Sequence, residues 1–239
     1  MRTLVLQHIA CEPPGYYEDV LLGRGAVIHR VEVDEGDPLP DWRDFELIVA
    51  MGGPMSVNDE DSFPWLVHEK RLISEAVRAG TPFWGACLGV QLLAASLGAR
   101  VHPGPEAEVG LLPVTLTAQA LADPVFAGLP SELLTLQWHG DTFELPAGAV
   151  LLAGSAAYPN QAFRYGERAY GVQFHLEVTP AMAKEWAAVP EYRESLDRTL
   201  GPGAFPALLD SLERNIELLG DTARRIFSQW LEHAVPAVV

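Results

Sequence analysis

The sequence is poor in cysteine and in basic residues, and it has no long apolar run. Two cysteines in 239 residues are too few for a disulfide framework, which favours a reducing, intracellular compartment. The 16 Lys and Arg residues against 32 Asp and Glu residues give a net charge of −16. This charge argues against nucleic acid or an anionic membrane as the main partner. No segment approaches the roughly 20 apolar residues of a membrane span, and the apolar stretch near the N-terminus is too short for a signal peptide. We therefore expect a cytoplasmic protein.

Internal repeats, low-complexity tracts and linkers rich in Gly or Ser are also absent from the sequence. A chain of this length can bury a full core. Its 49% hydrophobic and 20% charged residues are ordinary for a globular protein. We expect a single domain over residues 1–239, with a C-terminal helical extension at about residues 181–239.

Short β-type runs alternate with helical patterns near the N-terminus. Strands are predicted at residues 3–9, 26–33, 45–51 and 81–86, and helices at residues 17–23 and 65–79. This alternation is typical of a parallel sheet covered by helices. From about residue 109 to residue 176 the pattern becomes rich in strands, which predicts hairpins added to the sheet. The expected fold class is α/β, with a doubly wound, mostly parallel sheet, helices on both faces and added antiparallel strands.

The C-terminal part carries an amphipathic helical pattern. Apolar residues spaced three and four apart continue from Leu209 to Trp230, which predicts one long helix. The pattern runs through Gly220, although a glycine inside a helix costs about 1 kcal/mol and Asp221 could cap a second helix. We expect the helix to pack on its own domain, because three heptads are too few to require a coiled-coil partner.

One of the two cysteines lies in an unusual segment. Cys87 is the centre of GACLG (residues 85–89), between a short buried strand and a helix predicted at residues 90–97. The spacing is that of a nucleophile elbow with sulfur in place of oxygen, and the glycines allow the strained backbone of such a turn. A helix N-terminus favours the thiolate, which predicts a lowered thiol pKa, and its free N–H groups can stabilise an oxyanion. Cys87 is therefore a candidate nucleophile, and an inert buried cysteine is the alternative.

A nucleophilic cysteine needs a base that a third group orients. Two histidines are followed two residues later by a carboxylate: His175 by Glu177, and His139 by Asp141. In a strand, residues two apart lie on the same face, and the surroundings of His175 predict a strand. Gly140 instead suggests a turn between His139 and Asp141. Spacing alone does not choose between the two pairs, and either histidine could be structural.

Five ordered segments resemble one enzyme family. GACLGVQLLA and GVQFHLEVTP resemble the cysteine and histidine–glutamate signatures of the class I, or triad, glutamine amidotransferases. The similarity is greatest to the amidotransferase domain of GMP synthase and its free-standing relatives. MGGPMSV resembles the family's oxyanion glycine loop, EVG its short acidic motif, and WHGD the loop that lines its glutamine pocket. The resemblance covers about residues 1–185.

The resemblance implies a catalytic triad and a reaction without metal or cofactor. Cys87 would attack the side-chain amide carbon of glutamine. His175 would take the thiol proton and pass it to the leaving ammonia, and Glu177 would orient His175. Hydrolysis of the resulting glutamyl thioester would complete the cycle.

The resemblance also implies positions for the other site residues. The backbone N–H groups of Gly53 and Leu88 would form the oxyanion hole. Gln91 would contact the amino-acid end of the substrate. His139 and Asp141 would have a structural or substrate-positioning role.

The sequence lacks the glycine-rich phosphate loop of an ATP-using synthase, which leaves the use of the ammonia open. The chain could deliver ammonia to a separate synthase subunit as a glutaminase. It could instead be a free-standing hydrolase of γ-glutamyl peptides or γ-glutamyl polyamines. A third alternative is a regulatory binding protein without turnover, although the intact triad argues against it.

Overall fold

The computed structural model describes residues 1–186 and 188–235, and a mixed β-sheet lies at its centre. Within these residues the strands follow the spatial order β2-β1-β3-β4-β9-β8-β7-β5-β6. The first five in this order are parallel, and the remaining pairs are antiparallel. The predicted α/β fold with added antiparallel strands is confirmed. The strands are β1 (Arg2–Gln7), β2 (Val27–Glu32), β3 (Leu47–Ala50), β4 (Phe83–Ala86), β5 (Val101–Leu116), β6 (Glu132–Phe143), β7 (Ala149–Gly154), β8 (Ala162–Tyr165) and β9 (Ala169–Val172).

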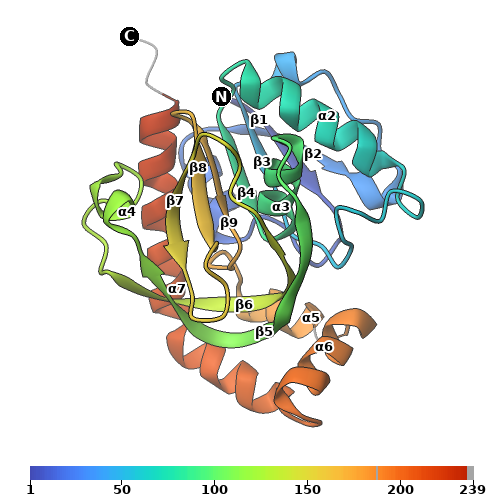
Figure 1. Cartoon of the computed structure of the whole chain (residues 1–239), viewed down its shortest axis with the longest axis vertical. Coiled ribbons are helices and arrows are strands. Elements are labelled where there is room, and N and C mark those ends of the chain that lie inside the picture. The colour runs from blue at the N-terminus through green and yellow to red at the C-terminus, as the bar shows by residue number, and fades with distance from the viewer. Residues whose placement is uncertain (187, 236–239) are drawn as a thin grey trace.

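Helices cover both faces of this sheet (Figure 1). Helices α2 and α3 pack on one face, and α1 and α7 pack on the other. Alternate residues of a buried strand point to opposite faces. In β1, Val5 therefore contributes to the core beneath α1 and α7, while Leu4 and Leu6 contribute to the core beneath α2 and α3. The helices are α1 (Tyr16–Gly23), α2 (Trp65–Arg78), α3 (Leu88–Ser96), α4 (Ala118–Ala122), α5 (Pro180–Trp186), α6 (Pro190–Leu200) and α7 (Phe205–Ala234), with short 3-10 turns at Val33–Glu35 and Trp42–Asp44.

The long strands β5 and β6 form an antiparallel pair that curves across the lower part of the molecule in Figure 1, beside α5 and α6. The expected turn at Gly140 is wrong, because Gly140 lies inside β6. The irregularity is in the partner strand: β5 shifts register between Pro103 and Glu108. A bulge lets one strand bend while the other continues. His139 and Asp141 therefore lie on one continuous strand.

The long C-terminal helix predicted through Gly220 is confirmed as α7. Gly220 is buried against α1, where an added Cβ would lie 3.0 Å from the ring of Tyr16. The glycine thus allows the two helices to approach closely. Further along α7, Phe227 stacks on Tyr17 and Trp230 packs on Trp84 of β4. No helix in the described part of the chain is both long and apolar enough to cross a membrane.

We propose that α7 belongs to the same cooperative domain as the sheet, and replacement of Trp230 tests this. Trp230 is fully buried, and its Nε1 donates to the Arg168 carbonyl oxygen at 3.1 Å. Trp230→Ala should lower the free energy of unfolding by about 3–5 kcal/mol, as other buried Trp-to-Ala changes do. The measurement is urea denaturation followed by circular dichroism and fluorescence.

Leu218→Ala on the same helix is the matched control, because Leu218 is 55% exposed. This variant should change the unfolding free energy by less than about 0.5 kcal/mol. Equal midpoints for the two variants, or a separate early transition for α7, would contradict the single-domain proposal.

Candidate active site

Cys87 lies on a strained turn between β4 and α3. Its φ of 51° and ψ of −108° are unfavourable for a residue with a Cβ, and no other non-glycine residue in the described ranges has a positive φ. The flanking glycines allow α3 to lie very close to the sheet. An added Cβ on Gly89 would lie 2.1 Å from the Ala50 carbonyl oxygen, and one on Gly85 would lie 2.5 Å from the Gly89 carbonyl oxygen. The predicted elbow geometry is therefore present at Cys87.

His175 and Glu177 form a buried pair beside this turn. Nδ1 of His175 lies 2.7 Å from Oε1 of Glu177, and Oε2 of Glu177 accepts from the Leu176 backbone N–H at 3.0 Å. The prediction that both residues lie in a strand is wrong, because β9 ends at Val172. His175 instead makes an isolated bridge to Leu136 of β6. Since the chain has left the sheet, the carboxylate reaches the imidazole through a local bend and not through strand alternation.

The thiol of Cys87 and the imidazole of His175 face each other. Each influences the pKa of the other through charge and a side-chain hydrogen bond. Burial raises the pKa of the Cys87 thiol, and His175 opposes this effect. The expectation of a lowered thiol pKa is therefore wrong, because desolvation is the largest influence on the sulfur. Burial alone would lower the pKa of His175, but Glu177 and Cys87 raise it well above its usual value. The two groups are thus coupled: burial favours the protonated thiol, whereas Glu177 and Cys87 favour the protonated imidazole.

The two residues whose amides are expected to form an oxyanion hole lie close together. Gly53 follows β3, and Leu88 is the first residue of α3. An added Cβ on Gly53 would lie 3.1 Å from Cδ2 of Leu88. Neither backbone N–H donates a hydrogen bond within the described residues. Both are therefore free to bind an oxygen atom next to Cys87.

Gln91 lies one helical turn after Cys87 and lines the same cavity. Its Nε2 donates to Oε1 of Gln173 at 3.0 Å, and Nε2 of Gln173 lies 3.6 Å from Sγ of Cys87. The Gln91 side chain is therefore already held by a buried amide network that ends at the sulfur.

His139 and Asp141 also line the cavity, but they are not joined to the triad candidates. His139 Nε2 lies 3.2 Å from Oε2 of Glu108 and 3.0 Å from Oε1 of Gln137. Asp141 Oδ2 accepts from the hydroxyl of Ser56 at 2.8 Å. His139 is thus fixed within a network of its own, which agrees with positioning rather than proton transfer at Cys87.

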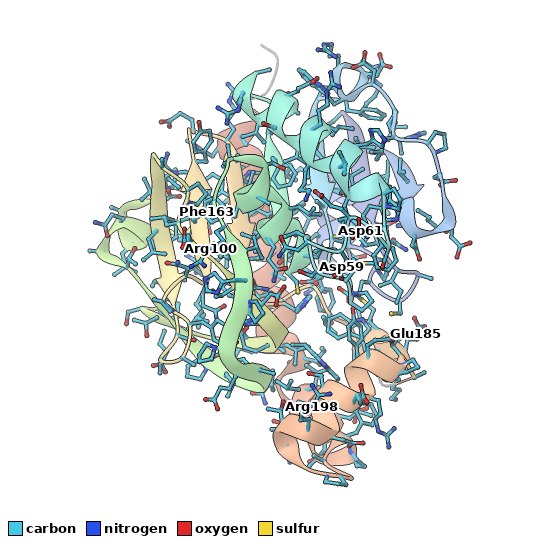
Figure 2. The ribbon with its side chains drawn as sticks, turned by 45° about the vertical axis from the view of Figure 1, so that its right-hand side comes forward. Asp59, Asp61, Arg100, Phe163, Glu185 and Arg198 are labelled. Carbon is cyan, nitrogen blue, oxygen red and sulfur yellow. The ribbon has the colours of Figure 1, made fainter. Side chains whose placement is uncertain are left out.

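A cavity of about 280 Å³ opens at Cys87. One wall carries Trp138, His139 and Asp141 of β6, and the loop after β3 supplies Asp59. Figure 2 shows Asp59 near the centre of the view, above the segment that contains α5 and α6. Helix α6 supplies the opposite wall through Glu191, Tyr192 and Ser195. In residues 1–186 and 188–235, no group of three or more His, Cys, Asp or Glu side chains is arranged to hold a metal ion.

Two residues near the site were not predicted from the sequence. Glu12 is buried beside Gly52, and the Tyr192 hydroxyl donates to its Oε1. Its Oε2 has no hydrogen-bond partner among the described residues. Burial raises the pKa of the Glu12 carboxyl, and His175 opposes this shift. The sequence gives no signal for this contact, because Glu12 and Tyr192 are 180 residues apart.

Comparison with known proteins identifies a family and several relatives. The family model for glutamine amidotransferase class-I matches residues 20–187. The glutamine amidotransferase-like protein YfeJ of Salmonella typhimurium is 37% identical over 183 residues, which cover 75% of this chain and 77% of YfeJ. GMP synthase (glutamine-hydrolyzing) of Streptococcus thermophilus is 39% identical over 136 residues, which cover 55% of this chain but only 24% of that enzyme. The crystal structure of a glutamine amidotransferase from Thermotoga maritima has a TM-score of 0.87 and 33% identity, with 99% of each chain covered.

The two cysteines should differ sharply in reactivity towards a chloroketone analogue of glutamine. Burial raises the pKa of both thiols, but Cys87 lines the cavity and His175 opposes the rise, whereas burial and Glu12 raise the pKa of Cys11 to about 12. We expect the reagent to modify Cys87 alone at neutral pH, with protection by added glutamine. Intact-mass measurement and peptide mapping give the modified position.

Cys11→Ser is the matched variant and should be labelled like the wild type, while Cys87→Ser should not be labelled. An adduct on Cys11 with Cys87 unmodified would overturn the choice of nucleophile.

Proposed function

Because the chain belongs to the class I glutamine amidotransferase family, we propose that it hydrolyses the side-chain amide of glutamine through a cysteinyl thioester and releases ammonia. The observation that carries this proposal is the position of Cys87. Its thiol lies on a strained turn at a cavity and faces a buried imidazole that a carboxylate orients. This arrangement is typical of an activated nucleophile.

In the proposed reaction, His175 accepts the thiol proton as Sγ of Cys87 attacks the amide carbon. The carbonyl oxygen becomes an oxyanion, and the N–H groups of Gly53 and Leu88 stabilise it. His175 then gives its proton to the leaving nitrogen, so that ammonia departs and a glutamyl thioester remains. Water attacks the thioester with His175 again as base, which releases glutamate and restores the thiol. Glu177 holds the imidazole in the orientation that both proton transfers require.

Side chains around the cavity suggest how the amino-acid end of glutamine is held. Asp141 can accept from the α-ammonium group, and its bond to Ser56 fixes the position of the carboxylate. Gln91 would contact the same end of the substrate from α3. His139 would keep the β6 wall in place through Glu108. Burial raises the pKa of Glu108, but the hydrogen bonds from His139 and Ser155 lower it below its usual value overall, so this support stays ionised at neutral pH.

A second candidate function is hydrolysis of γ-glutamyl conjugates, among which the acidic lining favours conjugates of amines. Asp59, Asp141 and Glu191 line the cavity, and no Lys or Arg among the described residues does so. A substrate that carries additional positive charge would be attracted to such a lining. A γ-glutamyl polyamine fits this description better than an acidic γ-glutamyl peptide does.

If the chain is a glutaminase, the released ammonia needs an acceptor. The relatives named GMP synthase (glutamine-hydrolyzing) suggest a separate synthase subunit that accepts ammonia from this chain. Both cysteines are free thiols, which suits a reducing compartment such as the cytoplasm.

The assignment of the base is tested by His175→Ala. Without an imidazole to move protons, turnover of the best γ-glutamyl substrate should fall by about 10³-fold or more, with the loss in the chemical step. Steady-state and single-turnover kinetics measure this. His68→Ala, a change at an exposed position on α2, should leave turnover unchanged. The roles would be reversed if His139→Ala abolished the chemical step and His175→Ala did not.

Release of glutamate in the absence of any partner separates the two candidate functions. Two-part amidotransferases couple their sites, so an isolated glutaminase subunit should hydrolyse glutamine slowly. A self-sufficient hydrolase should instead be fast on its own conjugate. The panel contains glutamine, γ-glutamyl peptides and γ-glutamyl polyamines, with Cys87→Ser as the blank. Fast turnover of one conjugate without turnover of glutamine would reject the glutaminase and support the hydrolase.

A further inference from the structure

His8 is a buried histidine near the site that the reaction described above does not use. It follows β1 and has no exposed surface. Its Nδ1 lies 3.2 Å from the Gly52 carbonyl oxygen, and its Nε2 lies 2.8 Å from Oε1 of Glu69 on α2. The ring also stacks on Trp65, with 5.7 Å between the ring centroids. Packing and two hydrogen bonds therefore fix the imidazole in one orientation.

The hydrogen atoms on this ring follow from its partners. A carbonyl oxygen can only accept, so Nδ1 must donate to Gly52. Its Nε2 faces a carboxylate oxygen of Glu69. Burial alone would lower the pKa of His8, but the charge and hydrogen bond of Glu69, together with the Gly52 carbonyl, raise it above its usual value. A raised pKa favours the protonated ring, and a protonated ring donates to the Gly52 oxygen more strongly than a neutral one does.

The carbonyl that His8 holds belongs to the peptide unit whose N–H is on Gly53. In a planar trans peptide, the C=O and the N–H point in opposite directions, so fixing one fixes the other. Glycines on both sides of the peptide would otherwise allow it to rotate. Within the described residues, His8 is the hydrogen-bond partner of the Gly52 oxygen, and the Gly53 N–H has none.

We infer that His8, held by Glu69, is a positioning residue for the oxyanion hole: it fixes the Gly52–Gly53 peptide with the Gly53 N–H directed at the reacting carbonyl oxygen. This inference rests on the proposed cysteine hydrolysis and adds a part to it. His8 touches neither the substrate nor the sulfur, and it acts through the peptide that it holds.

A pair of variants of similar size separates the hydrogen bond from the volume of the ring. His8→Asn places an amide N–H near the position of Nδ1, whereas His8→Leu fills similar space without a donor. We expect His8→Leu to lower kcat for glutamine, or for the best γ-glutamyl substrate, by about 10- to 10³-fold. The upper limit corresponds to the complete loss of one hydrogen-bond donor from the oxyanion hole. KM should change by less than about 3-fold, since binding of the ground state is untouched. His8→Asn should keep kcat at least about 5-fold above that of His8→Leu.

The rate of alkylation of Cys87 by iodoacetamide distinguishes a specific loss of the oxyanion hole from a general structural defect, because a general defect would change this rate as well. This displacement occurs at a tetrahedral carbon and forms no oxyanion, so its rate should be the same in the wild type and in both variants. Equal losses of kcat and of the alkylation rate in His8→Leu would overturn the inference, because the thiol itself would then be disturbed. Wild-type kcat in His8→Leu, or equally low kcat in both variants, would also overturn it.

Glu69→Gln tests whether the contact of Glu69 with His8 is needed to hold the Gly52–Gly53 peptide. If His8→Leu does not fold, Glu69→Gln and His8→Asn together provide the test. Glu69→Gln should lower kcat less than His8→Leu does, with KM and alkylation unchanged. Glu75→Gln is the matched control, because Glu75 is exposed on the same helix, and it should have wild-type kcat. If Glu69→Gln also had wild-type kcat, the role of Glu69 would be rejected. A wild-type protein that hydrolyses no γ-glutamyl amide would overturn the proposed function and this inference with it. Wild-type kcat in His8→Leu would overturn the inference alone.

Discussion

The close contact between α3 and the parallel strands is the constraint on which the site depends. Because no side chain fits between Gly89 and Ala50, the helix begins directly above the end of β3 and β4. Cys87 must then leave the sheet with a backbone conformation that costs of order 1–3 kcal/mol. Pairing of β4 with β3 and β9, and the bond from the Cys87 N–H to the Val172 carbonyl at 2.9 Å, offset this cost. The same contact brings the N-terminus of α3 next to the loop after β3.

The other half of the site is assembled from distant parts of the chain. His175 is held by its bridge to Leu136 and by Trp186, whose ring centroid lies 4.8 Å from that of the imidazole. Tyr192 on α6 closes the cavity and contacts Glu12 near the N-terminus. This enclosure desolvates the thiol, and the charges around the imidazole oppose the desolvation. The proton affinity of the pair therefore depends on this enclosure and on the charges around it.

Local signals explain what could be predicted from the sequence. The alternating patterns gave the α/β sheet, and the glycines on either side of Cys87 gave the elbow, because both depend on residues close together in the chain. The strand expected around His175 was wrong because periodicity cannot show where a chain leaves a sheet. The turn expected at Gly140 was wrong because the compensating bulge lies in the other strand. Glu12 and Tyr192 were missed, and so was the link from His8 to Glu69, because only the folded chain brings these residues together.

The contact between Tyr192 and Glu12 also determines when the site can close during synthesis of the chain. On the ribosome, residues up to Gly89 emerge when the proposed base and the whole of α6 do not yet exist. The parallel strands around Cys87 can pair early, but His175 comes later, and the wall formed by α6 comes later still. A nascent chain therefore exposes its thiol without the groups that would activate it. The closed site can therefore form only after α6 has been made.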